Sequence, residues 1–178
     1  MNEKLVKDKI SRIEDPELRR LVEACLEQVP NHFWMKPSSS TGKYHPKDEH
    51  LPGGLSLHTA RVSDVAELII DSLKYRCTPD IVRTGALLHD ISRYGTAEKP
   101  TEHSLHNHPL LGAGWVAEVG HKLDPPIEED KLQEVCSTVR SHMGRWHDPS
   151  PDSVNEVLVH LADVIAAGYI PVRGERLE

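Results

Sequence analysis

The sequence predicts an all-α protein, a compact helical bundle of about seven helices. Apolar residues recur at the three- and four-residue spacing of helices along most of the chain, and short segments rich in Pro and Gly separate these runs. Only 4% of the residues are aromatic, so the core must be built from Leu, Val, Ile and Ala. A chain of 178 residues is expected to form a single domain over 1–178 with a core of its own.

The first clear helix signal follows Asp15, where Pro16 suits a first helical turn and an apolar stripe follows it. We therefore expect N-terminal helices within residues 1–36. Residues 37–54 are rich in Ser, Pro, Gly and charge and predict a long loop. A loop of this length within a compact domain is more often functional or mobile than idle.

Five further helices are expected beyond this loop. Thr78 and the Ser153–Glu156 capping box mark two of the starts, and Pro109 follows a third. The expected ranges are 56 to about 75, 79 to near Gly95, 108–119, 128–142 and 153–165.

Composition excludes several classes of protein. The 28 acidic residues outnumber the 21 basic ones, for a net charge of −7, so we expect no nucleic-acid coating. No apolar run is long enough to span a bilayer, and the N-terminus lacks the apolar stretch of a secretory signal, so we expect no membrane association and a cytoplasmic location. The three cysteines form no CxxC pair, which argues against a disulfide framework or a thiolate zinc site. A homo-oligomer is compatible with the sequence.

Histidine is unusually abundant, with 12 residues in the chain, and it is the commonest metal ligand. The clearest motif is His89-Asp90, at the end of an apolar helix. Asp163 lies within an apolar helix, where an unpartnered carboxylate would cost several kcal/mol. A divalent cation shared with buried imidazoles would satisfy that carboxylate.

These residues resemble the signature H…HD…D of the HD-domain superfamily of metal-dependent phosphohydrolases. The matching segments are LSLHTARV around His58, LLHDISRYG around His89-Asp90 and VHLADVI around Asp163. The resemblance covers about residues 53–168. It implies a helical core in which His58, His89, Asp90 and Asp163 bind one divalent metal ion.

Some members of this superfamily carry two further histidines that hold a second metal. His108 and His142 occupy the corresponding part of this sequence, although His103 and His106 crowd the same loop as His108. The resemblance thus implies one or two divalent ions, drawn from Mn, Fe, Co, Ni, Zn or Mg. Asp90 is the natural bridging ligand because one carboxylate offers two oxygens.

The activity implied is hydrolysis of a small phosphorylated compound, such as a nucleotide, by metal-activated hydroxide. The ester would be a phosphomonoester or a phosphodiester. We expect Asp90 and Arg93 to act in catalysis, with Arg93 also binding phosphate where the family often has Lys. Three residues of polar loops, Lys43, His45 and Lys99, are further candidates for substrate binding.

Two other functions remain open from the sequence. The myo-inositol oxygenase branch of the same fold holds two irons in a similar ligand set, and ligand identity alone does not separate iron from Mn, Co or Zn. The third hypothesis is a metal-stabilised module that senses a nucleotide without hydrolysing it.

Overall fold

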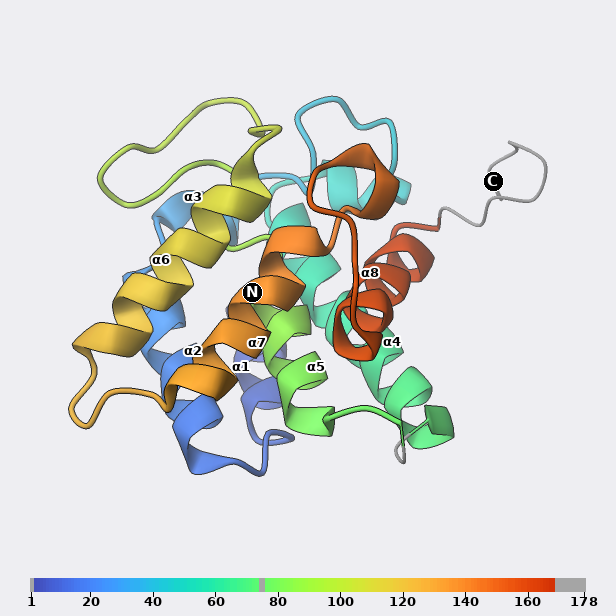
Figure 1. The fold of residues 1–178 in the computed structure, drawn as a ribbon. Helices are drawn as coiled ribbons and strands as arrows, with labels where there is room; N and C mark the ends of the chain where they lie inside the picture. The colour runs from blue at the N-terminus through green and yellow to red at the C-terminus, as the bar shows by residue number, and fades with distance from the viewer. Residues whose placement is uncertain (1, 74–75, 169–178) are drawn as a thin grey trace.

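The computed structural model describes residues 2–73 and 76–168. Within these ranges the chain forms eight α-helices and two short 3₁₀-helices, and its one β-type pairing is an isolated bridge between Gly95 and Pro100 (Figure 1). The all-α prediction is confirmed. No helix in these ranges combines the length and apolar character that crossing a bilayer requires. The elements are α1 Glu3–Ile10, α2 Pro16–Gln28, α3 Asn31–Met35, η1 Lys47–His50, α4 Gly54–Leu73, α5 Pro79–Leu88, α6 His108–Lys122, α7 Glu129–Ser141, η2 Gly144–Trp146 and α8 Val154–Ala166.

Two helix starts follow their sequence signals. The Asp15 carboxylate accepts hydrogen bonds from the first backbone amides of α2, and the Ser153 hydroxyl accepts one from the Glu156 amide in α8. The side chain of Thr78 does not cap α5; its backbone amide donates to Asn155 Oδ1 instead.

The predicted end of α5 near Gly95 is wrong. The helix ends at Leu88, because the amides of Ile91, Arg93 and Gly95 each bond to the carbonyl three residues back and form successive turns. The predicted loop 37–54 is also less irregular than expected, since it contains η1, and α4 begins within it at Gly54.

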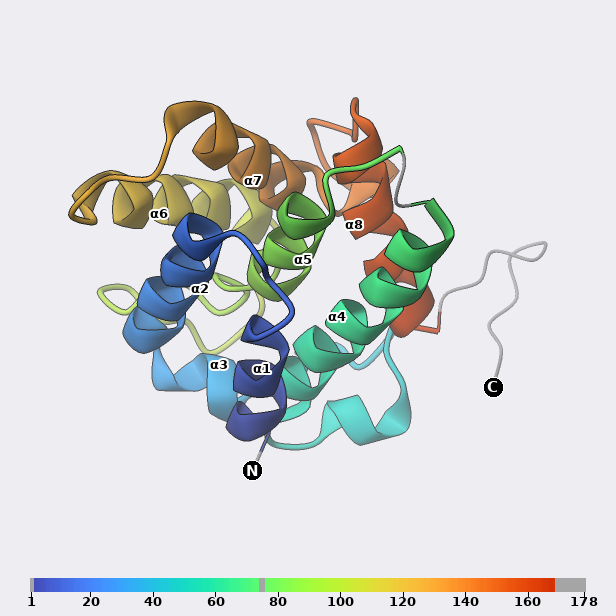
Figure 2. The same ribbon diagram turned by 90° about the horizontal axis from the view of Figure 1, so that it is seen from below.

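The core surrounds α5. Figure 2 shows this helix in the middle of the bundle, and it contacts α2, α4, α7 and α8. One apolar cluster joins α5 to α1, α2, α6 and α7, and a second joins it to α4 and α8. Both are built mainly from aliphatic side chains, as the low aromatic content predicts.

Helices α5 and α7 approach each other closely at Gly85. A Cβ atom at this position would lie 2.2 Å from Thr138 Oγ1, so only glycine permits the observed spacing. His89 lies about one turn beyond Gly85, and His142 about one turn beyond Thr138. The close packing therefore places these two histidines side by side, with ring centroids 5.1 Å apart.

The 37–54 loop and the 96–107 loop meet at the C-terminal end of α5. The Ser40 and Ser104 hydroxyls are 2.8 Å apart, and Lys36 Nζ lies 2.6 Å from Glu102 Oε2. The Tyr94 hydroxyl adds a bond by donating to the carbonyl of Pro37. Figure 1 shows both loops at the same end of the molecule as η2.

Candidate metal centre

Five helices bring six of the predicted ligand residues together. His58 lies in the second turn of α4, His89 and Asp90 directly follow α5, His108 begins α6, His142 directly follows α7 and Asp163 lies in the last turn of α8. All except Asp163 are almost completely buried, and the Asp163 side chain is 20% exposed. Because five of these residues lie at or near helix ends, their side chains can converge without interrupting a helix.

One half of the cluster lies between α4, α5 and α8. His58 Nε2 is 2.9 Å from Asp163 Oδ1, and His89 Nε2 is 4.0 Å from the same oxygen. His89 Nε2 also lies 3.8 Å from Asp90 Oδ2. These short separations between ligand-type atoms give the three-residue group of His58, His89 and Asp90 the geometry to hold a metal ion.

The other half uses the remaining oxygen of Asp90. Oδ1 is 2.8 Å from His108 Nε2 and 3.4 Å from His142 Nε2, and the two imidazole nitrogens are 3.2 Å apart. Two nitrogens bound to one metal at about 2.0–2.1 Å would themselves lie roughly 3.0–3.4 Å apart. Asp90 thus belongs to two of the three groups of described residues that could hold a metal ion, the third being His45, Glu49 and His58.

Backbone carbonyls fix the orientation of three of the rings. His89, His108 and His142 each place Nδ1 within 2.6–2.9 Å of the carbonyl three residues back, which belongs to Ala86, Leu105 and Val139 respectively. A carbonyl can only accept, so each Nδ1 carries a proton and each ring turns its Nε2 atom to the centre. Metal-binding histidines characteristically hold their second nitrogen in this way.

The centre is arranged to receive a cation. His89 Nε2 is buried without a hydrogen-bond partner, and the Nε2 atoms of His108 and His142 lie 3.2 Å apart. Burial lowers the pKa of His89 and of His108 to about 4, with the Arg93 charge contributing at His108, so both rings are neutral near pH 7. The donor set of imidazole nitrogens and carboxylate oxygens suits a divalent transition metal.

The carboxylates stay ionised despite their burial. Burial opposes the charge of Asp90, yet Arg93 and the neighbouring imidazoles hold its pKa well below the ordinary value. The pKa of Asp163 is likewise lowered against burial, mainly through its contact with His58. Burial alone would lower the pKa of His58, but Asp163 and Glu49 together raise it to about 10.

The other predicted residues take different positions. Arg93 Nη1 lies 3.0 Å from His108 Nε2 and 3.9 Å from Asp90 Oδ1, so its guanidinium borders the centre. Lys43 and Lys99 are exposed on their loops. His45 is largely buried, with Nδ1 3.0 Å from Glu49 Oε2, and its ring lies edge-on to that of His58.

Among the histidines of the 96–107 loop and the start of α6, only His108 joins the cluster. His103 and His106 are exposed, and the His106 ring packs near His147 instead. His160 reaches the centre indirectly, because its Nδ1 donates to the carbonyl of His142 at 2.6 Å.

Sequence reasoning missed Glu49. Its side chain is fully buried and lies against His58, although it belongs to the polar run Lys47–His50. A carboxylate within such a polar run is expected to lie on the surface, in contact with solvent. The only available signal was the 37–54 loop itself, which precedes His58 closely enough to fold back on it.

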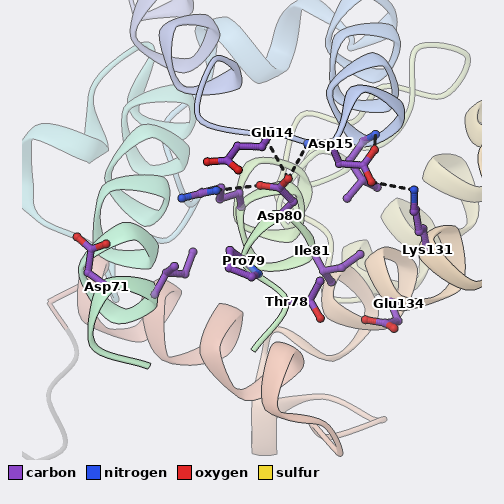
Figure 3. Close-up of a pocket in the computed structure, with 12 residues that line it drawn as sticks. Glu14, Asp15, Asp71, Thr78, Pro79, Asp80, Ile81, Lys131 and Glu134 are labelled. Atoms are coloured by element: carbon purple, nitrogen blue, oxygen red, sulfur yellow. Dashed lines mark hydrogen bonds and ion pairs between the residues drawn. The ribbon is translucent and has the colours of Figure 1, made fainter. Parts of the chain in front are cut away.

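A separate cavity of about 370 Å³ lies at the opposite end of α5 (Figure 3). Two of its acidic side chains are already partnered: Asp80 accepts from the amides of Glu14 and Asp15 and pairs with Arg83, and Lys131 pairs with Asp15. None of the six clustered residues lines it.

The helical bundle and its buried histidine–aspartate cluster define a metal-binding class of α-helical domain, and comparison with known proteins identifies the family. The HD domain model matches residues 55–168, so the chain belongs to the HD-domain family. HD domains bind divalent metals, and the described residues contain the ligand clusters to do so.

One curated relative is the dihydroneopterin 2',3'-cyclic phosphate phosphodiesterase of Methanocaldococcus jannaschii. It is 28% identical over an alignment 168 positions long that covers 85% of this chain and 64% of the relative. The chain thus spans less than two thirds of the length of the relative it matches. No solved structure gives a significant match.

Proposed function

We propose that the protein is a metal-dependent phosphohydrolase that acts on a small phosphorylated compound. The observation that carries the proposal is the position of Asp90, whose two oxygens belong to two adjacent groups of metal-ligand atoms. Family membership and the phosphodiesterase relative support hydrolysis of a phosphoester over other chemistry.

The six clustered residues would hold two divalent ions, with Asp90 between them. His58, His89 and Asp163 would complete one site, and His108 and His142 the other. When bound, such ions lower the pKa of a coordinated water and polarise a phosphoryl oxygen. Two dications against two carboxylates leave a net positive centre, which attracts a phosphate ester despite the acidic chain.

Arg93 is the residue best placed to hold the substrate phosphate. Its side chain borders the centre and is 16% exposed, and its Nε is buried without a hydrogen-bond partner. A guanidinium can donate two parallel bonds to phosphate oxygens and stabilise the charge that develops as the ester bond breaks. Lys43, His45 and Lys99 stay predictions for substrate binding.

The relative suggests the first substrate class to test, a 2',3'-cyclic phosphodiester. Hydrolysis would add water across one P–O ester bond and leave a phosphomonoester with a free hydroxyl. A cytoplasmic location and self-association stay predictions.

The test is a substrate panel with added Mn²⁺ or Co²⁺. It should include 2',3'-cyclic nucleotides, bis(p-nitrophenyl) phosphate and p-nitrophenyl phosphate, with Asp90→Ala as the inactive control. We expect phosphoester cleavage by the wild type alone. Oxygen uptake by the iron-loaded protein, without cleavage of any ester, would instead indicate the oxygenase chemistry. Tight binding of a nucleotide without turnover would indicate a sensing module.

A further inference from the structure

His58 differs from the other three clustered histidines in the partner of its Nδ1 atom. His89 and His142 follow helix ends, where carbonyls lack intrahelical partners, and His108 uses the carbonyl of a loop residue. His58 lies inside α4, where each carbonyl accepts from an amide of the next turn. It therefore needs an acceptor from outside its own helix.

Glu49 places a carboxylate beside this nitrogen, within ion-pair distance but outside hydrogen-bond geometry. Its Oε2 atom lies 3.2 Å from His58 Nδ1, and both side chains are completely buried. On the other side of the ring, Nε2 faces Asp163 in the cluster. The His58 ring thus lies between a carboxylate outside the cluster and the cluster itself.

Two side chains hold the Glu49 carboxylate in place. Arg61 Nη1 lies 2.7 Å from Oε1, and His45 Nδ1 lies 3.0 Å from Oε2. Arg61 is on α4, about one turn beyond His58, so it fixes the carboxylate relative to the helix that carries the ring. Arg61 also binds Asp48, the exposed neighbour of Glu49.

The backbone of η1 is fixed as well. A Cβ atom at residue 54 would lie 1.9 Å from the Glu49 carbonyl oxygen, so Gly54 lets η1 lie directly on the start of α4. The same carbonyl accepts a hydrogen bond from the Ser38 amide. Glu49 is therefore held at both its main chain and its side chain, which a surface carboxylate does not require.

We propose that Glu49 is a positioning residue that orients His58 for metal binding, with His45 and Arg61 holding the carboxylate. The inference rests on the proposed metal-dependent function, because it assigns a role relative to a metal ligand. It makes the 37–54 loop part of the metal centre. Carboxylate–histidine–metal arrangements of this kind typically raise metal affinity 10- to 100-fold.

Glu49→Gln tests the proposal, with Asp48→Asn as the matched control. Both substitutions remove one negative charge from an Arg61 partner, but only Glu49 touches His58. Co²⁺ affinity is measured by competition with a chelator, the visible spectrum of bound Co²⁺ reports its ligands, and thermal unfolding without metal reports the fold. We expect Glu49→Gln to weaken Co²⁺ binding 10- to 100-fold and to alter the spectrum. Asp48→Asn should change the affinity less than about twofold.

Equal affinity and spectra for wild type and Glu49→Gln would overturn the proposal, as would equal losses in the two variants. Failure of the wild type to bind Co²⁺ would contradict the proposed function itself. If Glu49→Gln does not fold, NMR spectra of the ¹⁵N-histidine-labelled wild type, loaded with Zn²⁺ in place of Co²⁺, test the contact between Glu49 and His58. A His58 Nδ1 proton protected from exchange supports the contact with Glu49, and its rapid exchange overturns the contact.

Discussion

The Nε2 atoms of His108 and His142 face each other across 3.2 Å, while the Nδ1 atom of each ring is bound to a carbonyl. Arg93 Nη1 lies 3.0 Å from the His108 nitrogen, so a guanidinium cation borders this pair of imidazoles. Three separate features produce the relationship: the start of α6, the end of α7 and the adjacent carboxylate of Asp90. The two imidazoles and the Asp90 carboxylate thus form one buried group of metal-ligand atoms.

Metal binding should stabilise the protein. At a free Mn²⁺ concentration 100 times Kd, binding adds about 2.7 kcal/mol to the free energy of unfolding. For a chain of this size, that corresponds to a rise in Tm of roughly 5–11 °C. Thermal unfolding with Mn²⁺ and with EDTA measures it. Identical melting curves under the two conditions would contradict the metal centre.

Asp90→Ala should abolish bound metal and activity together, because both groups of ligand atoms lose their shared carboxylate. Elemental analysis of protein purified without chelator, combined with the phosphoester assay, checks this. Asp130→Asn, an exposed change on α7, serves as the control and should retain both metal and activity. Full metal occupancy in Asp90→Ala would show that the ligand set is wrong.

His142→Ala should reduce the metal content from two ions to one, since His142 contacts only the Asp90–His108 half of the cluster through its Nε2 atom. His103→Ala is the matched control, because His103 is exposed on the neighbouring loop. The measurement is metal stoichiometry by elemental analysis. Unchanged stoichiometry in His142→Ala would argue against a dinuclear centre.

Arg93→Ala should lower kcat/KM for a phosphoester by roughly 10- to 150-fold, the equivalent of about 1.5–3 kcal/mol for hydrogen bonds to a charged group. Metal content should be retained, because guanidinium groups do not ligate metals. Lys43→Ala and Lys99→Ala provide comparison, and their exposed positions predict smaller losses. A larger loss in either lysine variant would indicate that a loop lysine, and not Arg93, binds the substrate phosphate.

The three thiols should react in order of increasing burial, with the least buried thiol first. Burial raises the pKa of Cys25 to about 12 and that of Cys136 to about 11, whereas Cys77 is only half-buried. A raised pKa keeps the thiol protonated, so at pH 8 roughly one Cys25 in ten thousand is a thiolate. Titration of the native protein with a disulfide reagent should modify Cys77 first and Cys25 only on unfolding. Fast modification of Cys25 would contradict the α2 packing.

Local signals in the sequence account for the fold class and for the residues of the cluster. The positions of His89 and Asp90 follow from an apolar helix that ends just before them, and Asp163 is conspicuous as a carboxylate in an apolar helix. Their convergence is observed in the structure, while their role as ligands stays a prediction.

Glu49 could not be found in the same way. Its burial depends on packing against Gly54 and on contacts with Arg61 and His45, and none of these contacts has a periodic signature. The early end of α5 has a similar origin. Residues 89–95 contain no proline that would mark the end of the helix, but the chain forms turns there, and Gly95 has a positive φ.

The missing Cβ atom at Gly85 has a consequence for protein engineering. Because α5 and α7 touch at this point, a methyl group there would push apart the two helices that carry His89 and His142. Substitution at residue 85 would thus alter the spacing of these two histidines while every side chain of the cluster keeps its identity.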